Sequence, residues 1–266
     1  MNPYLSGERL YGNDLDAVGI ADWFRDEAEA YFQMGGDSQA AENYGYRELN
    51  RQALFRHIHD RTFAHAIGLG AGRGTELLPI ASRVGRLSVV ESSTEYVADP
   101  TLPIPVTMVE AQPSGDLAFE AQAADLITSL GVLHHIPNVQ HVLAEFARVL
   151  APGGLALIRE PIHSMGGDWG QPRRGLTPHE RGIPLHLLRA WLKENGFRIT
   201  HETLVMFPPI GRLWRLTGHP PYNSQTLTAT DRAVCALLKR NLRYHATKWS
   251  EKLRPTSVAL IAVKDQ

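Results

Sequence analysis

The stretch HAIGLGAGRGTELL, residues 65–78, decides the fold class of this chain. It opens with an apolar run at 65–69 that is typical of a buried β-strand, and it continues through four glycines into a helical run at 75–81. Glycines suit a tight turn between strand and helix because no Cβ blocks the approach of a ligand. The free amides at the start of such a helix bind negative or polar groups. The stretch therefore predicts a strand–turn–helix unit that binds a ligand.

Strand-like runs recur at regular intervals on the C-terminal side of this unit. They lie at residues 87–91, 106–110, 125–130 and 155–160, and polar or helical segments separate them. This alternation is the pattern of βαβ units around a parallel sheet. The clearest helix is expected at 139–150, with Asn138 as its N-cap and Pro152-Gly153-Gly154 as its stop. A helix at 184–195 and two strands at 197–205 and 257–263 should follow, and the two strands are expected to pair antiparallel at a sheet edge.

Three segments do not fit the alternation: residues 1 to about 60, about 161–183 and about 206–256. We expect an N-terminal helical cap at 1–60 and a main domain at 61–266 that carries the other two segments as lid insertions. Helices are expected within these segments at 21–32, 44–59 and 230–242. The last insertion has about 50 residues between two strands of one sheet, which is too long for a structureless loop.

Charge and cysteine content exclude several classes of protein. The 266 residues include 27 Lys plus Arg and 28 Asp plus Glu, so no basic field attracts nucleic acid. The single cysteine, Cys235, excludes an internal disulfide and a zinc site with two or more thiolates. No apolar run approaches the about 18 residues of a membrane helix, and no signal-peptide core opens the chain. We expect a cytoplasmic protein without membrane insertion, and the sequence leaves its oligomeric state open.

The residues around the glycine turn narrow the kind of nucleotide that it binds. Glu91 ends the second strand, where an acidic side chain can hydrogen-bond both hydroxyls of a ribose. A dinucleotide fingerprint G-x-G-x-x-G is incomplete, because its sixth position is Arg73 or Thr75 in the two possible registers. No lysine follows to make a phosphate loop. What the chain carries is the run G-x-G-x-G at residues 70–74.

This glycine run, Glu91, DLITSLGVLHHIP at 125–137 and FARVLAPGGLALI at 146–158 together resemble class I S-adenosylmethionine-dependent methyltransferases. The resemblance is strongest to the group that includes the ubiquinone and menaquinone biosynthesis methyltransferases, and it covers about residues 64–160. It implies an α/β fold, a Rossmann-like open sheet of order 3-2-1-4-5-7-6 with helices on both faces. It also implies S-adenosylmethionine as cofactor and methyl transfer to O, N or C of a small molecule. A sugar, a lipid-linked intermediate or a polyketide-like intermediate would suit the large lids.

The resemblance assigns cofactor-binding residues to the ends of the first four strands. They are Gly68, Gly70, Gly72, Glu91, Ser92, Glu110, Ala111, Ser129 and Gly131. One departure stands out, because Gly68 occupies a position where the family commonly has an acidic residue that helps to fix the methionine ammonium. We therefore expect the amino-acid end of the cofactor to be bound differently here.

Two histidines near the ends of the fourth and fifth strands are candidate general bases. His163 is the leading candidate, because it follows the fifth strand at the carboxyl edge and an imidazole titrates near neutral pH. His134 is the second, and packing and capping beside the next helix is the structural reading that the sequence favours for it. Exposure to solvent is the alternative for His163.

Side chains in the two insertions are candidate acceptor contacts: Trp169, Arg173 and Tyr222. Anchoring of the lids by the aromatic rings, and surface pairs such as one between Arg181 and Glu180, are the alternatives. His57, His59 and His65 lack a third ligand at a suitable spacing, so no metal is expected.

Two other functions remain open from the sequence. A cofactor-binding partner subunit or sensor without catalysis would explain Gly68 and the lack of an unmistakable base. A nicotinamide-dependent oxidoreductase would share the glycine turn and the ribose acid.

Overall fold

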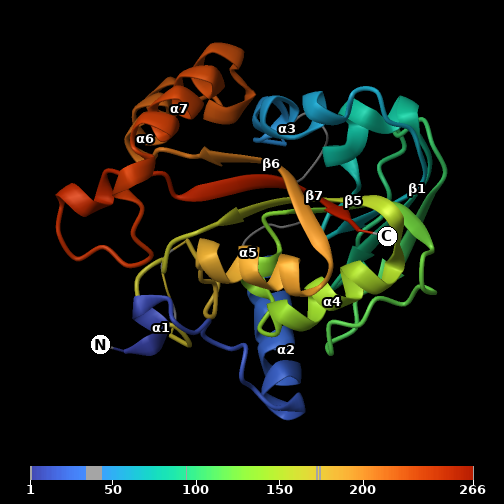
Figure 1. Ribbon diagram of the computed structural model, residues 1–266, viewed down its shortest axis with the longest axis horizontal. Helices are drawn as coiled ribbons and strands as arrows, with labels where there is room; N and C mark the ends of the chain where they lie inside the picture. The colour runs from blue at the N-terminus through green and yellow to red at the C-terminus, as the bar shows by residue number, and fades with distance from the viewer. Residues whose placement is uncertain (1, 34–43, 94, 172, 174, 266) are drawn as a thin grey trace.

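A seven-stranded sheet of order β3-β2-β1-β4-β5-β7-β6 runs through the centre of the computed structural model (Figure 1). The structure describes residues 2–33, 44–93, 95–171, 173 and 175–265. The strands are β1 (Phe63–Leu69), β2 (Val84–Glu91), β3 (Val106–Glu110), β4 (Ala124–Leu130), β5 (Leu150–Pro161), β6 (Phe197–Val205) and β7 (Ser257–Lys264). The first five pair in parallel, whereas β7 runs antiparallel to both β5 and β6. The expected strand order and the antiparallel edge are confirmed.

The turn between the fourth helix and β5 differs from the sequence expectation. The Pro152-Gly153-Gly154 stretch lies within β5 rather than before it, since the strand starts at Leu150. Ala124 pairs with Leu150 and Leu126 with Leu155, so the intervening residues of β5 bulge out of the ladder. Gly153 has a φ of +76°, which a glycine adopts at little cost.

Helices cover both faces of the sheet (Figure 1). On one face lie α4 (Val139–Val149) and α5 (Leu185–Glu194), and on the other lie α3 (Arg47–Ala53), η3 (Phe55–Ile58) and η4 (Thr75–Arg83). Each layer has its own apolar core. Phe146 and Leu192 belong to the first core and Leu54 and Ile80 to the second, and all four are buried. Burial of each such side chain stabilises the fold by about 1.5–3 kcal/mol.

Several helices deviate from their expected form for local reasons. The helix after the glycine turn, η4, is a 3-10 helix that contains Pro79, whose ring removes an amide donor from an α-helical ladder. The helix expected at 44–59 is divided into α3 and η3 at Leu54, which has φ −129° and ψ −67°. Asn138 stands at the N-cap of α4 without capping it, because its side-chain amide donates to the Ser114 carbonyl at 2.7 Å.

The N-terminal segment contributes α1 (Pro3–Ser6) and α2 (Ala17–Gln33). The insertion between β6 and β7 contributes α6 (Pro208–Trp214), α7 (Gln225–Leu237) and the short helices η6 (Arg215–Thr217), η7 (Pro221–Asn223), η8 (Lys239–Asn241) and η9 (Ser250–Lys252). Helix α7 starts earlier than expected, since the Ser224 hydroxyl accepts from the Leu227 amide at 3.3 Å and caps it. It packs against β6 and α3.

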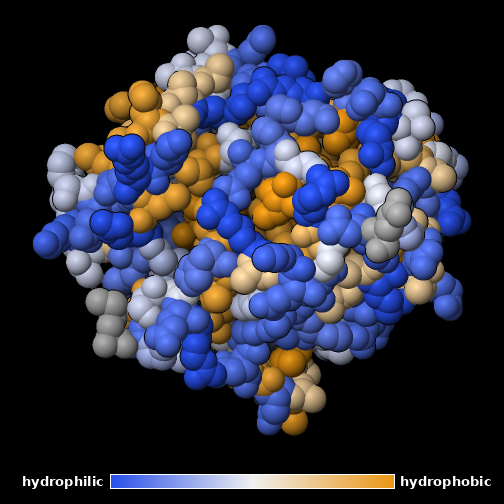
Figure 2. All heavy atoms as spheres, in the orientation of Figure 1, coloured by the Kyte–Doolittle hydropathy of each residue, from blue (hydrophilic) through white to orange (hydrophobic). Residues whose placement is uncertain are grey.

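The surface in this view is largely hydrophilic, and hydrophobic atoms gather around α6 and α7 (Figure 2). Leu213, Leu216 and Leu237 are exposed there. Among the helices of the described ranges, none combines the length and the apolar character that crossing a bilayer requires.

Candidate functional site

The glycine turn after β1 places every second residue in the left-handed region of backbone conformation. Gly70, Gly72 and Gly74 have φ values of +61°, +57° and +84°. The Gly70 amide donates to the Val90 carbonyl at 2.8 Å, which fixes the turn against β2. A Cβ on Gly70 would lie 2.5 Å from Cγ2 of Val132, in the loop after β4. The turn and that loop therefore approach each other as closely as glycine alone permits.

Glu91 lies at the end of β2 beside this turn. Its Oε1 accepts a hydrogen bond from the Gly72 amide. Burial raises the pKa of the Glu91 carboxyl to about 7, although hydrogen bonds from the Gly72 and Ser92 amides oppose that shift. The sequence predicted an acidic residue at the end of the second strand, and in the structure this residue accepts a hydrogen bond from the glycine turn.

A cavity opens at the carboxyl ends of β1 to β4. We call it the first cavity. Of the predicted cofactor residues, it is lined by Gly70, Glu91, Ser92, Ala111 and Gly131. Helix α2 supplies Phe24, Glu27 and Ala28 to its wall, which no sequence signal had indicated.

Four predicted cofactor residues lie outside that lining: Gly68, Gly72, Glu110 and Ser129. Gly68 and Ser129 are buried within neighbouring strands, where Gly68 pairs with Thr128 and Ser129 with Leu69. The Glu110 side chain is exposed at the end of β3. Gly72 contributes indirectly through its amide, which binds Glu91.

A second cavity adjoins the first, and both are lined by Gly70 and Gly131. Both histidine candidates, His134 and His163, line this second cavity. Sequence reasoning missed most of its other polar wall, which includes Tyr44, Tyr46, Glu76, Arg159 and Glu180. These residues come from four separate segments, so their convergence depends on the fold.

His134 is held by a fully buried carboxylate at the end of β5. Its Nδ1 lies 2.8 Å from Oε2 of Glu160. The Oε1 of Glu160 also accepts from the amides of Val132 and Leu133, at 2.8 and 2.9 Å. Burial acts to raise the pKa of Glu160, but the hydrogen bond and charge of His134 outweigh it and lower the pKa below its usual value. Glu160 is therefore a carboxylate that orients the His134 ring.

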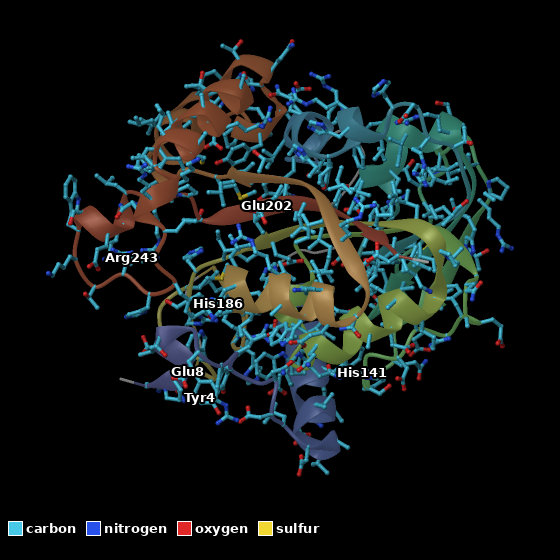
Figure 3. All side chains as sticks on the ribbon, in the orientation of Figure 1. Tyr4, Glu8, His141, His186, Glu202 and Arg243 are labelled. Carbon is cyan, nitrogen blue, oxygen red and sulfur yellow. The ribbon has the colours of Figure 1, made fainter. Side chains whose placement is uncertain are left out.

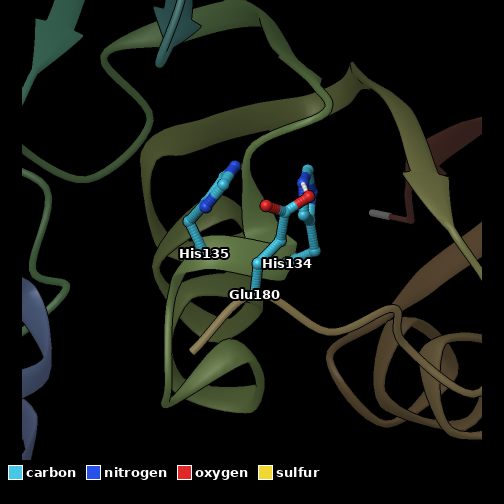
Figure 4. A group of neighbouring side chains, drawn as sticks. All are labelled: His134, His135 and Glu180. Carbon is cyan, nitrogen blue, oxygen red and sulfur yellow. Dashed lines mark ion pairs between the residues drawn. The ribbon is translucent and has the colours of Figure 1, made fainter. Parts of the chain in front are cut away.

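A second carboxylate approaches the other side of the His134 ring. Oε1 of Glu180, from the segment after β5, lies 3.4 Å from Nε2 of His134, and Figure 4 shows this ion pair. Burial would lower the pKa of His134, but Glu160 and Glu180 raise it to about 9. The same contact lowers the pKa of Glu180 to about 2, against the effect of its burial. In this arrangement His134 is an imidazolium between two carboxylates.

His135 neighbours this group and lines the first cavity. Its Nδ1 lies 2.8 Å from Oε2 of Glu27, on α2. His134, His135 and Glu180 bring potential metal-ligand atoms within 4.8 Å of one another. A metal ligand must be deprotonated, so the imidazolium form of His134 opposes a cation here.

His163 is half-buried rather than exposed. Its Nδ1 lies 3.2 Å from the Thr256 carbonyl. Burial lowers the pKa of His163 to about 4, so the ring is neutral at neutral pH. A neutral imidazole of that pKa is a weak proton acceptor.

The three predicted acceptor contacts line neither cavity. Trp169 stacks on Tyr11 with ring centroids 5.0 Å apart. Arg173 donates to carbonyls of its own segment, at Met165 and Thr177, at 3.0 Å each. Tyr222 is buried and stacks on Tyr46. Trp169 and Tyr222 thus anchor the two insertions to the N-terminal segment, whereas Arg173 holds its own segment together.

Arg181 does not make the surface pair that the sequence suggested. Its side chain is fully buried and donates to the carbonyls of Tyr11 at 2.9 Å, His134 at 2.7 Å and Ile136 at 2.9 Å. A guanidinium has five N–H donors, and backbone carbonyls of two distant segments satisfy several of them here. Arg181 thus ties the N-terminal segment to the loop after β4.

Residues 66–158 match the family model described as a methyltransferase domain. An uncharacterized 37.1 kDa protein in transposon TN4556 of Streptomyces fradiae is 30% identical over 146 residues, which cover 53% of this chain and 39% of that protein. Highly reducing polyketide synthase 2 of Gibberella zeae is 32% identical over 83 residues, 27% of this chain and 3% of the synthase. The chain thus spans about two-fifths or less of the length of these curated relatives.

Solved structures with the same fold include a 1,6-didemethyltoxoflavin-N1-methyltransferase from Burkholderia thailandensis, bound to S-adenosylhomocysteine. It is 17% identical with a TM-score of 0.55, and the match covers 95% of this chain and 92% of that one. The [4+2]-cyclase SpnF is 18% identical with a TM-score of 0.55, over 94% and 96% of the two chains. A methyltransferase from Mesorhizobium loti is 16% identical with a TM-score of 0.54, over 85% and 100%. At these identities the likeness establishes the fold.

Proposed function

We propose that the protein is a class I S-adenosylmethionine-dependent methyltransferase that methylates a small-molecule acceptor, a proposal supported by the match of residues 66–158 to a methyltransferase domain. The observation that carries the proposal is the junction of the two cavities at Gly70 and Gly131. A cofactor in the first cavity can present its methyl group to an acceptor in the second. Transfer between ligands held in this way gains mainly from proximity and alignment.

The first cavity fits the nucleoside of the cofactor. Glu91 is an acceptor-only group when ionised, and it lines the cavity where ribose hydroxyls could donate to it. Ser92 and Ala111 line the same cavity and are suited to contact the ribose and the adenine. Gly70 leaves room that a Cβ could not share with Val132. When bound, S-adenosylmethionine supplies an electrophilic methyl group.

We assign the handling of the acceptor's proton to His134 ahead of His163. His134 faces the second cavity, and the Glu160 carboxylate fixes its ring. This is the arrangement of a general base oriented by a third group. An acceptor that displaces Glu180 from Nε2 removes one of the two carboxylates that keep His134 protonated, so the pKa of His134 falls toward neutrality. His163 is suited to hydrogen-bond the acceptor rather than to take its proton.

The acceptor class follows from this assignment. A base is needed when the acceptor is a hydroxyl, a protonated amine or a carbon acid. The match to a polyketide synthase supports a polyketide-like intermediate among the sugar, lipid-linked and polyketide-like candidates.

We also infer that the N-terminal segment and the two insertions cover the site. Phe24 on α2 lines the first cavity, and Met206 and Thr256, which bound the last insertion, line the second. Residues 34–43 of the expected N-terminal cap lie outside the described part of the chain.

Calorimetry with S-adenosylmethionine and S-adenosylhomocysteine tests the first step. We expect binding of both, and no binding at millimolar concentration would refute the function. The second step is transfer of a radiolabelled methyl group to polyketide-like acceptors by the wild-type protein, His134→Gln and His163→Gln. Loss of transfer only in His163→Gln would reverse the assignment of the base.

A second candidate, a cofactor-binding protein without methyl transfer, is favoured by one observation. The same fold occurs in a protein described as a [4+2]-cyclase, so the fold does not by itself require methylation. Tight binding of S-adenosylhomocysteine with no labelled product from any acceptor would support this candidate. Binding of a dinucleotide in its place would indicate an oxidoreductase.

A further inference from the structure

Two buried side chains of opposite charge face the second cavity and have no part in the mechanism above. They are Glu76, at the start of η4, and Arg159, near the end of β5. Their exposed fractions are 5% and 6%. Within the described ranges no ion pair joins either one to a partner, so a ligand of opposite charge can complement each.

Glu76 lies near Gly68 of β1, the position at which the resembled family commonly has an acidic residue. Its Oε1 accepts from the Thr128 hydroxyl at 3.1 Å. Thr128 pairs with Gly68 across the sheet, and its Oγ1 would lie 3.7 Å from a Cβ on Gly68. That Cβ would also lie 2.7 Å from Cβ of Ala71, so a carboxylate cannot come from position 68 in this backbone. Glu76 brings one to the same neighbourhood from the helix.

The environment of Glu76 favours a cationic ligand. Burial raises the pKa of Glu76 to about 8, and the charge of Arg159 only partly offsets that shift. A buried carboxylate without a cation beside it is costly, and an ammonium group would relieve that cost.

Hydrogen bonds and a ring contact fix the position of the Arg159 guanidinium. Its Nε donates to Oδ1 of Asn50 at 3.0 Å, and its Nη2 donates to the Leu130 carbonyl at 2.7 Å. The guanidinium lies over the Tyr46 ring at 4.4 Å. A Cβ on Gly131 would lie 3.6 Å from Nη1, which places the guanidinium at the junction of the two cavities. A rigid guanidinium of this kind suits a carboxylate.

We propose that Glu76 and Arg159 together bind the amino-acid end of the cofactor, with Glu76 at its ammonium and Arg159 at its carboxylate. The proposal rests on the proposed function, because it takes S-adenosylmethionine as the ligand. A ligand with a single charge would leave one of the two side chains without a counter-charge, whereas a zwitterion complements both. The pair replaces the acid that Gly68 does not provide.

The first measurement needs no variant. Calorimetry compares S-adenosylhomocysteine with 5′-methylthioadenosine, which keeps the nucleoside and thioether and lacks the amino-acid end. We expect S-adenosylhomocysteine to bind at least about 10-fold more tightly, because each hydrogen-bonded charge contributes on that scale. Equal affinities would overturn the proposal and leave the proposed function standing. Binding of neither ligand would overturn both.

Variants assign the two charges separately. Glu76→Gln and Arg159→Gln should each weaken S-adenosylmethionine about 10- to 100-fold and leave 5′-methylthioadenosine within about 3-fold. Decarboxylated S-adenosylmethionine keeps the amine and lacks the carboxylate. Its affinity should fall in Glu76→Gln and not in Arg159→Gln.

Glu202→Gln, on the surface of β6, is the matched control and should change none of these affinities (Figure 3). Equal losses for all three nucleosides in a folded variant would contradict the assignment. A second outcome would also contradict the assignment: Arg159→Gln binds S-adenosylmethionine as the wild type does but has a raised KM for the acceptor. Arg159 would then bind the acceptor instead of the cofactor.

Discussion

Nδ1 of His134 lies 2.8 Å from Oε2 of Glu160, and this contact joins the loop after β4 to the end of β5. Glu160 also accepts from two amides of that loop, at Val132 and Leu133. One buried carboxylate therefore sets both the orientation of the histidine ring and the course of the loop that borders both cavities.

Replacing Glu160 by Gln should separate these two roles. The amide oxygen can still accept from the loop amides, but the negative charge beside His134 is lost. We expect the pKa of His134 to fall well below about 9, as measured by NMR titration of its ring protons. Turnover should fall about 100-fold with S-adenosylhomocysteine affinity within about 2-fold. An unchanged His134 titration would refute the role of Glu160.

The His134 contact should also appear in the pH dependence of stability. The pKa of His134 is about 9 in the folded protein and near its ordinary value of 6.5 when unfolded. The stabilisation is therefore complete below about pH 6.5 and is lost as the pH rises through about 9. In urea denaturation at pH 6 to 9.5, the difference in unfolding free energy between the wild type and His134→Asn should shrink with rising pH. A constant difference would contradict this.

Glu91→Ala should weaken S-adenosylhomocysteine by about 1–3 kcal/mol, because an ionised acceptor for the ribose hydroxyls is removed. Since the pKa of Glu91 is about 7 before the ligand binds, wild-type affinity should also rise from pH 6 to pH 8. That rise should be smaller in Glu91→Gln. Calorimetry across this range is the measurement, and unchanged affinity in folded Glu91→Ala would exclude Glu91 from the site.

Arg181→Met should lower the unfolding free energy by about 3–5 kcal/mol, because the carbonyls of Tyr11, His134 and Ile136 lose a buried charged donor. The matched control is Arg189→Met. Arg189 is half-exposed and pairs with Glu202 on the surface, so its loss should cost less than about 1 kcal/mol. Urea denaturation measures both, and similar costs would show that Arg181 is not structural.

Much of the central sheet could be predicted, because its signals are local. Apolar runs of strand length and the glycine turn at 70–74 locate β1 to β5, and the resemblance supplied the strand order that the structure confirms. The form and the boundaries of single elements were predicted less accurately, because backbone details decide them. The helix predicted after the glycine turn is the 3-10 helix η4, which contains Pro79, and β5 begins before its apolar run and includes a bulge at Gly153.

The candidate site could be predicted only in part, because only some of its residues lie on elements that a local sequence pattern locates. Glu91 and Gly70 sit on the strand ends that the pattern located, so their place at the first cavity followed. Glu76 and Phe24 reach the cavities from helices whose packing no local pattern fixes. Arg181 was misread because a charged residue in a polar segment gives no sign of the distant carbonyls that bury it.

The contacts of Glu27 on α2 connect the wall of the first cavity to a segment beside the second. Its carboxylate accepts from the Thr177 hydroxyl and the His179 amide, so the wall of the first cavity is fastened to the segment that carries Glu180 beside the second. Displacing α2 from the first cavity would break these bonds and remove one restraint on the segment that carries Glu180 beside the second cavity. Access past α2 to the first cavity and the position of Glu180 thus depend on the same two hydrogen bonds.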